Sequence, residues 1–367
     1  DKMICCAAII LVGISFNEKE RYLNFGFSLL KKIINNSFDS QNFPKTRNIS
    51  QLNFYLKYFI LIREWLKESQ NDIPENINEI IFYLGQSYNF IWQSLNQPLL
   101  FNGNHEDDFY EFDKYLEIHG YKFKNKNNFI GGYGIFKNKK TILAMDMGPS
   151  PDKKLSNDYQ SGSLSFEFFY NNRKIICNSG YFQKYNHRLN EISKSTASHS
   201  ALIVDNRSSV NFIKKLNENT AVKKNLKILK KSFFSKKNYW YMNGSHDGYL
   251  KEYGIIHERS LECFLETFKL VGQDKLIKKR NFKKSNFEIR FHFLPGTKIT
   301  KTKDGKSILI DVENSGWKFY CPNHVLQIET GLYFGKKNSF TENQNIYISG
   351  VTQKEDQLIN WELSKIA

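Results

Sequence analysis

The chain has 367 residues, of which 40% are hydrophobic and 25% charged, and this composition is typical of a globular protein with room for two domains. A formal net charge of +16 argues against basic partners and favours polyanions, namely acidic polysaccharide, nucleic acid or an anionic membrane. The five cysteines are an odd number without CxxC spacing, which argues against a disulfide framework and favours reduced thiols in a reducing compartment.

The N-terminal third of the chain has helical periodicity. Apolar residues recur at steps of three and four from Met3 to about Leu100, which predicts paired helices joined by polar loops. The first run, Met3 to Phe16, is too short to span a bilayer and lacks the basic start and cleavage site of a signal peptide. We therefore expect an amphipathic or buried helix there and no transmembrane segment. Because the chain begins with Asp, a fragment that lacks its own signal is also possible.

A polar stretch, FDSQNFPKTRNISQL, separates two of these helices at residues 38–52. Arg47 and Asn48 are candidates for gripping an anionic group, because guanidinium geometry matches a carboxylate. Tyr55 lies one turn further on, and its side chain either packs against aromatic neighbours or serves as a catalytic tyrosine.

The helical part closes with PLLFNGNH at residues 98–105, in which we expect a turn at Asn102 and an exposed His105. Charged residues follow. These features predict a helical domain over 1–112, a linker over 113–128 and a second domain over 129–367.

After Phe129 the pattern changes to short strands at roughly ten-residue spacing, beginning with a hairpin at Gly131-Gly132-Tyr133-Gly134. An antiparallel β-sandwich accommodates that pattern. The predicted fold class is therefore α+β, with helices first and a β-sandwich second.

Residues 155–204 contain three predicted strands, at 164–170, 174–177 and 201–204, with polar loops between them. These loops bring together polar residues that are either turn formers and caps or a functional constellation: Asp158, Gln160, Asn178, Ser195, Thr196 and His199.

A second polar segment, GSHDGYLKEYGIIHERSL, starts at Gly244. If it is a hairpin, residues of equal parity share one face, so His246, Tyr249, His257 and Arg259 are expected to lie close together. The histidines are acid/base candidates because their protonation changes near neutral pH, although a strand-end histidine bonded to the backbone is the alternative.

Lysine pairs at 223–224, 230–231 and 236–237 fit predicted loops and strand edges, where they favour solubility and protect edges from pairing. No nucleic-acid motif accompanies them, so no nucleic-acid partner is expected.

The order of these segments, with LSFE before an Asn-Ser-Gly turn and STASHSALIVD after it, resembles the heparinase II/III-like family of polysaccharide lyases and most closely a proteobacterial branch. The resemblance implies an incomplete α/α toroid before the sandwich and β-elimination of an acidic, uronate-containing polysaccharide in the cleft between them. It makes the following residues candidates: for catalysis His246, His257, Tyr249 and Asn48, and for substrate binding Arg47, Asn102, Tyr133, Asp158 and Arg259.

The same resemblance implies that family zinc ligands fall on Gln160, Asn178 and His199. Two neutral amides and one imidazole suit zinc poorly, so we expect no bound metal and no other cofactor, with His199 bonded instead to Gln160 or Asn178. A glycan-binding relative without catalysis is the alternative function, and a basic nucleic-acid-associated protein is a third. The resemblance implies the cell envelope or periplasm, whereas the reduced cysteines favour the cytoplasm.

Overall fold

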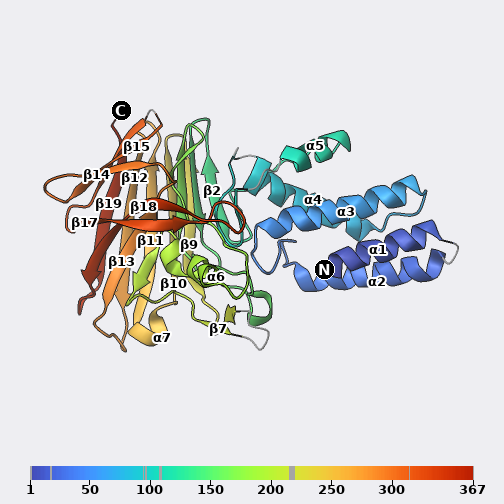
Figure 1. The fold of residues 1–367 in the computed structure, drawn as a ribbon, viewed down its shortest axis with the longest axis horizontal. Helices are drawn as coiled ribbons and strands as arrows, with labels where there is room; N and C mark the ends of the chain where they lie inside the picture. The colour runs from blue at the N-terminus through green and yellow to red at the C-terminus, as the bar shows by residue number, and fades with distance from the viewer. Residues whose placement is uncertain are drawn as a thin grey trace. The chain divides into compact units, whose positions relative to one another are not determined.

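The computed structural model describes residues 2–16, 19–93, 95, 97–106, 110–214, 220–313 and 315–366. The chain divides into two compact units, one formed by residues 1–96 and 108–131 and the other by residues 97–107 and 132–367. The first is helical and the second consists mainly of antiparallel sheets (Figure 1). Helices followed by antiparallel strands are what the sequence predicts.

The helical unit follows the predicted periodicity. Its helices are α1 (Lys2–Ser15), α2 (Lys19–Ser37), α3 (Ser50–Glu68), α4 (Glu75–Tyr88), the π-helical turn η1 (Asn89–Gln93) and α5 (Tyr110–Ile118). In α3, Leu52, Leu56, Phe59 and Ile60 are buried, which is the spacing of one helix face. Helix α5 extends into the stretch for which the sequence predicts a linker. None of the described helices combines the length and the apolar character needed to cross a bilayer.

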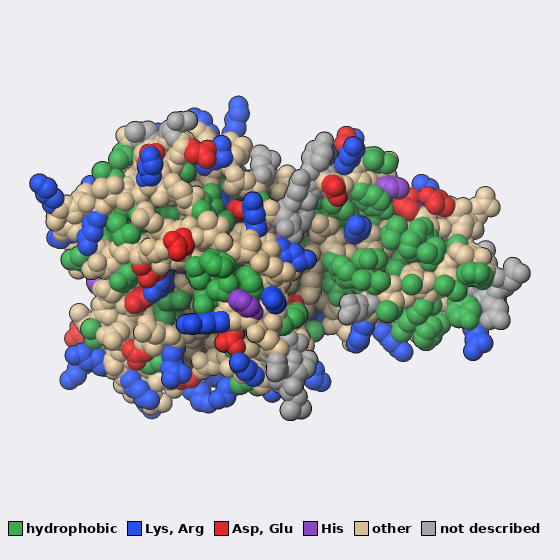
Figure 2. Space-filling model, viewed as in Figure 1, with side chains coloured by type: hydrophobic (Ala, Val, Ile, Leu, Met, Phe, Trp, Pro, Cys, Tyr) green, Lys and Arg blue, Asp and Glu red, His purple; other side chains and the backbone are tan. Residues whose placement is uncertain are grey.

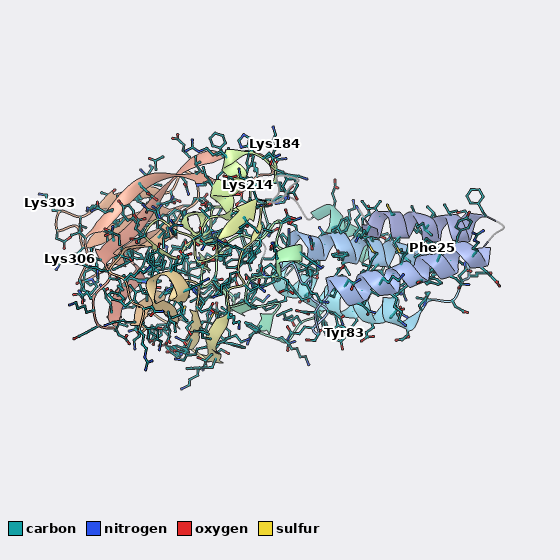
Figure 3. The ribbon with its side chains drawn as sticks, turned by 90° about the horizontal axis from the view of Figure 1, so that it is seen from below. Phe25, Tyr83, Lys184, Lys214, Lys303 and Lys306 are labelled. Carbon is teal, nitrogen blue, oxygen red and sulfur yellow. The ribbon has the colours of Figure 1, made fainter. Side chains whose placement is uncertain are left out.

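Helices α1 and α2 pack closely because glycines lie between them. A Cβ at Gly26 would come within 2.5 Å of Ile10 Cγ1, and one at Gly13 within 2.8 Å of the Leu23 backbone nitrogen. The outer faces of the helices remain apolar, with Phe25 and Phe82 each 55% exposed. Figure 2 shows hydrophobic side chains gathered over the visible face of this unit, and Figure 3 shows Phe25 and Tyr83 pointing away from the helices.

The strands are β1 (Phe129–Ile130), β2 (Tyr133–Lys137), β3 (Thr141–Asp146), β4 (Phe166–Tyr170), β5 (Arg173–Ile176), β6 (Leu202–Val204), β7 (Phe212–Lys214), β8 (Thr220–Val222), β9 (Ile228–Lys236), β10 (Tyr239–His246), β11 (Ile255–Phe264), β12 (Lys269–Lys278), β13 (Asn286–His292), β14 (Lys298–Lys301), β15 (Ser307–Val312), β16 (Ser315–Tyr320), β17 (Leu326–Tyr333), β18 (Thr341–Val351) and β19 (Gln357–Lys365). The short helices between them are η2 (Lys153–Leu155), α6 (Arg188–Lys194), η3 (Thr196–Ser198) and α7 (Leu250–Tyr253).

In the second unit the strands pair in neighbouring order β2-β3-β4-β5, β17-β18-β13-β6, β7-β8 and β14-β15-β16-β19-β12-β11-β10-β9. An aromatic cluster joins three of these sheets. The Trp361 ring of β19 stacks on Phe166 of β4 at 5.5 Å and meets Phe291 of β13 edge-on at 4.8 Å. Strand β9 is a sheet edge, and its lysines are exposed, as predicted for edge protection.

The cysteines agree with the sequence analysis in being free, although Cys5 is exposed while the other four are buried. His105 is a correction, because the expected exposed residue is 5% exposed. It lies in the segment 97–107, which belongs to the sheet unit.

Candidate functional site

Asn102 and Tyr133 meet in a buried polar cluster of the sheet unit. The Asn102 amide nitrogen donates to Tyr133 Oη at 2.7 Å and to Asp146 Oδ2 at 3.1 Å. Its oxygen accepts from the Gln160 backbone N–H at 3.2 Å, and Gln160 Oε1 accepts from the Gly103 N–H at 2.8 Å. Asn102 and Gly103 have positive φ angles, so these bonds hold a tight turn in an unusual conformation. The two predicted substrate residues are therefore close together but have little exposed surface.

Asp158 lies nearer to solvent, beside two tyrosines. Its Oδ1 accepts hydrogen bonds from Tyr181 at 3.0 Å and from Tyr185 at 2.8 Å. Burial, reinforced by the Asp158 charge, raises the pKa of both phenols above the ordinary tyrosine value, so both stay protonated. Because the Tyr185 side chain is 48% exposed, this group can offer a sugar two kinds of acceptor, the phenol oxygen of Tyr185 and the carboxylate of Asp158. A carboxylate repels a uronate carboxylate, so Asp158 suits sugar hydroxyls.

Lys194 is a buried cation in the same region. Its Nζ donates to the Asn157 carbonyl at 2.5 Å and to Thr220 Oγ1 at 2.8 Å. Burial lowers the pKa of Lys194 to about 8, against the opposing charges of Asp158 and Glu191. The ammonium group therefore loses its proton more readily than an ordinary lysine.

The three positions implied as zinc ligands are held by contacts within the fold. Gln160 Nε2 donates to two carbonyls, of Gly180 and Ser193, while Asn178 Oδ1 accepts from the Ser200 N–H. The His199 Nε2 atom is buried without a partner, but a Cβ on Gly162 would lie 3.0 Å from it, so the imidazole edge is covered by the Gly162 backbone. Within the described ranges, no group of three His, Cys, Asp or Glu side chains is arranged to hold a metal ion.

His199 does not bond Gln160 or Asn178, which corrects the expectation. Its Nδ1 lies 2.9 Å from the Ser195 carbonyl oxygen and therefore carries the proton. Burial lowers the pKa of His199 to about 4, and the bond to Ser195 opposes that shift. The ring is neutral at physiological pH.

His246 and His257 are directly paired across β10 and β11, as the predicted hairpin requires. Gly248 donates its N–H to His246 Nδ1 at 3.1 Å, so that nitrogen carries no proton and His246 Nε2–H points to His257 Nδ1, 3.3 Å away. His257 Nε2–H then donates to Asp274 Oδ1 at 2.7 Å. The backbone N–H of Gly248 thus fixes both tautomers.

Arg259 completes this buried histidine network, which we define as His246, His257, Arg259 and Asp274. Its guanidinium contacts both Asp274 oxygens, at 2.8 and 3.1 Å, and donates to the carbonyls of Leu164 and Ser200. All four side chains are buried. The bonds to Leu164 and Ser200 tie the network to the loops that hold Gln160 and His199.

The charges in the network follow from its surroundings. Burial, reinforced by the neighbouring His257 and Arg259, holds the pKa of His246 well below its ordinary value. Burial also lowers the pKa of His257 more than Asp274 raises it. Burial alone raises the pKa of Asp274, but Arg259 and His257 together bring it below the ordinary carboxyl value. The network is therefore an Arg–Asp ion pair with two neutral imidazoles.

The remaining candidates hold backbone in place. Tyr249 donates its hydroxyl to the Leu202 carbonyl at 2.8 Å and to that of Arg207 at 3.2 Å, and it is 1% exposed. In the helical unit, Asn48 Oδ1 accepts from the Ser50 N–H at the start of α3, and Arg47 Nε donates to the Gly131 carbonyl at 3.1 Å. Tyr55 packs edge-on against Phe38 at 4.8 Å, which matches the packing interpretation.

Several site residues escaped the sequence analysis, namely Asp274, Lys194, Tyr181 and Tyr185. Asp274 leaves a signal in the sequence. It occupies every second position of β12 together with Leu270, Gly272 and Leu276, and these alternate positions are the buried ones. A charged residue among inward positions requires a buried partner. The other three lie in loops or in a short helix, where no periodicity identifies them.

Comparison with known proteins shows which family the sheet unit resembles. The sequence model of the heparinase II/III-like C-terminal domain matches residues 130–362 of the 367-residue chain, which is more than half of it. The chain belongs to the heparinase II/III-like family. The membership predicted from the LSFE and STASHSALIVD segments is thereby confirmed. No curated protein sequence matches the chain.

Solved structures of heparinases have the same fold. The heparan sulfate lyase from Pedobacter heparinus superposes with a TM-score of 0.80 at 13% identity, over 99% of this chain and 59% of that chain. A heparinase III gives 0.79 at 14% identity, over 99% and 60%, and a second heparinase III gene product gives 0.79 at 15%, over 99% and 59%. The chain thus spans about three fifths of the length of these relatives.

Proposed function

We propose that this heparinase-like protein cleaves an acidic, uronate-containing polysaccharide by β-elimination. The observation that carries the proposal is the family match over residues 130–362, and relatives of the same fold are named heparan sulfate lyase and heparinase III. The net charge of +16 supports a polyanionic substrate. We also propose that the helices are part of an α/α toroid, that the sheets form a β-sandwich, and that the glycan binds in a cleft between them.

The reaction needs three chemical functions. One group neutralises the uronate carboxylate, and a base removes the proton from the carbon beside it, so that the electron pair forms a carbon–carbon double bond. An acid protonates the glycosidic oxygen as its bond to the uronate ring breaks. We propose His246, His257 and Tyr249 for the proton transfers and Asn48 for neutralising the carboxylate. Sugar binding is proposed for Arg47, Asn102, Tyr133, Asp158 and Arg259.

The geometry sets a condition on the histidines. His246 Nδ1 is occupied by the Gly248 N–H, and the other ring nitrogens bond within the network. For His246 to take a proton from a sugar, the turn at Gly248 must release Nδ1. A catalytic His246 therefore implies movement of residues 246–249 when substrate binds.

An assay of polymer cleavage tests the proposal. A panel of uronate polymers that differ in sulfation is incubated with the protein, and the ultraviolet absorbance of the unsaturated product is followed. We expect the wild-type protein to form product from at least one polymer. The rate should fall at least a hundredfold with His246→Ala, as is typical for loss of a general acid or base. It should stay normal with His187→Asn, which keeps a hydrogen-bond acceptor at the start of α6.

The alternative function is glycan binding without catalysis. It is favoured by the engagement of both imidazoles of His246 and His257 in buried bonds, which leaves neither edge open to a ligand. Polymer binding by the wild-type protein without any unsaturated product decides for this alternative.

We also propose that the protein works without a bound metal, because the amide oxygens and nitrogens of Gln160 and Asn178 are used in the fold. Dialysis against a chelator is expected to leave the unfolding temperature unchanged. A lower unfolding temperature that zinc restores would contradict this. By family membership we propose a location in the cell envelope or periplasm.

A further inference from the structure

Two adjoining hollows flank the short helix α7 in the sheet unit. The first, of about 350 Å³, is lined by Asn211, Lys223, Asp247 and Glu252 among others, and the second, of about 480 Å³, by Lys279 and Arg280. Lys224 and Lys251 line both hollows, so the two are neighbouring parts of one basic surface. We call it the basic groove and define it by Lys223, Lys224, Lys251, Lys279 and Arg280.

The groove carries a net positive charge, because five basic side chains outnumber the two carboxylates of its lining. All five of its basic side chains are exposed, and no carboxylate in the described part of the chain forms an ion pair with them. The two carboxylates in the lining have other bonds, since Asp247 Oδ1 accepts from the Lys227 N–H at 2.8 Å and Glu252 Oε1 from Asn211 Nδ2 at 2.6 Å. In the view of Figure 2, Lys and Arg side chains gather along the lower edge of the sheet unit, which carries α7 in Figure 1.

The backbone beneath these side chains is fixed. Gly254 ends α7 in a left-handed conformation with φ of 66°, and its carbonyl accepts from the Lys279 N–H at 2.7 Å. The Lys223 N–H bonds to the Asn211 carbonyl at 2.8 Å, and the Leu226 N–H to Ser150 Oγ at 2.8 Å. The backbone around Lys223 and Lys279 is thus in place before a ligand arrives, so binding there needs to order side chains alone.

The lining favours one class of polyanion. Single-stranded nucleic acids are held by aromatic side chains on which bases stack, and the described residues that line the two hollows include no aromatic one. Lysine, arginine and asparagine side chains with small polar neighbours suit carboxylate or sulfate groups and sugar hydroxyls. Charge complementarity therefore points to an acidic glycan.

We propose that the basic groove binds the acidic polysaccharide on which the protein acts, through the carboxylate or sulfate groups of neighbouring sugars. This inference rests on the proposed function and adds a binding surface to it. Gly248 lines the groove and bonds to His246, so an occupied groove lies next to the turn that must release His246. Binding there would both retain the polymer and bring it to that turn.

The test compares two double variants that remove the same charge. Lys224→Gln with Lys251→Gln alters the groove, whereas Lys303→Gln with Lys306→Gln alters the exposed β14–β15 loop, which lies well away from α7 (Figures 1 and 3). Fluorescence anisotropy measures the affinity for an end-labelled sulfated uronate polymer, an unsulfated one and single-stranded DNA over a series of salt concentrations. Circular dichroism verifies that both variants fold.

We expect the groove variant to bind at least one uronate polymer about five- to tenfold more weakly, with a shallower dependence on salt, and the loop variant to stay within about twofold of the wild type. Equal polymer affinity of the two variants would overturn the proposal that the groove binds the glycan. DNA binding that is tighter than glycan binding and is lost only in the groove variant would overturn it too. Cleavage by the wild type is measured separately. If the wild type forms product but the two variants bind the polymer equally, the proposed groove is wrong and the proposed elimination stands. If the groove variant binds more weakly but the wild type forms no product, the groove is supported and the elimination is not.

Discussion

At the scale of single residues, Asp274 is fully buried and accepts hydrogen bonds from His257, Arg259 and Trp361. The sequence placed His246, His257 and Arg259 on one hairpin face, because strand parity within a hairpin is local information. It did not identify Asp274, because the strand that pairs with β11 on its other side is set by the sheet. Breaking one partner of a buried ion pair leaves a buried charge uncompensated.

Asp274→Asn is therefore expected to lower the free energy of unfolding by about 3–5 kcal/mol, since Arg259 loses its counter-charge while the side-chain volume is kept. Asp311→Asn, in the same sheet but exposed, is the matched control and should stay within about 0.5 kcal/mol. Urea denaturation measures both. Equal stabilities of the two variants would show that the network contributes nothing.

His199 predicts a dependence of stability on pH. Its folded pKa of about 4 lies below the ordinary value of 6.5, so below pH 6.5 the unfolded chain binds a proton that the folded chain does not. Stability contributed by the neutral ring is thus complete above pH 6.5 and is lost progressively as the pH falls towards 4, by at most about 3 kcal/mol. The buried rings of His246, His257 and His292 act in the same direction.

Denaturation of wild-type and His199→Gln protein between pH 7 and pH 4 tests this. The variant should show a flatter fall in the free energy of unfolding, whereas His187→Asn, at a partly exposed position, should follow the wild type. If the two variants have the same slope, His199 does not titrate as its burial requires.

At the scale of elements, the hairpin β10–β11 and the strands that follow it were predictable from alternating residues and turns. The contacts between sheets were not, because they depend on which strands become neighbours. Gly272 of β12 lies directly opposite Trp361 of β19, and a Cβ on Gly272 would overlap the indole ring. Phe166 and Phe319 stack on that ring and keep it from moving.

Gly272→Ala should therefore destabilise the sheet unit by about 1–3 kcal/mol through overpacking. Lys275→Ala, on the other face of the same strand, removes only an exposed ion pair and should cost less than about 1 kcal/mol. Thermal and urea unfolding of both variants provide the comparison. An unchanged Gly272→Ala protein would mean that Trp361 can shift freely.

At the scale of the whole molecule, the change from a period of three to four residues to short strands predicted helices before sheets, and the LSFE and STASHSALIVD segments predicted the family. Residues 97–107 group with the sheets although they follow the helices, because Leu100, Asn102 and Gly103 bond to side chains of Glu167, Tyr133 and Gln160. Such long-range bonds leave no local pattern. Neither do the engaged ring nitrogens of His246 and His257, which bear most directly on whether this family member is a lyase.

The chemistry of cleavage tests the proposed elimination most directly. A polymer that the protein cleaves is digested in water enriched in heavy oxygen, and the oligosaccharide products are analysed by mass spectrometry. Elimination breaks the bond to the glycosidic oxygen without adding water, so the products should carry an unsaturated uronate end and no heavy oxygen. Saturated products that contain heavy oxygen, or no cleavage of any uronate polymer, would contradict the account.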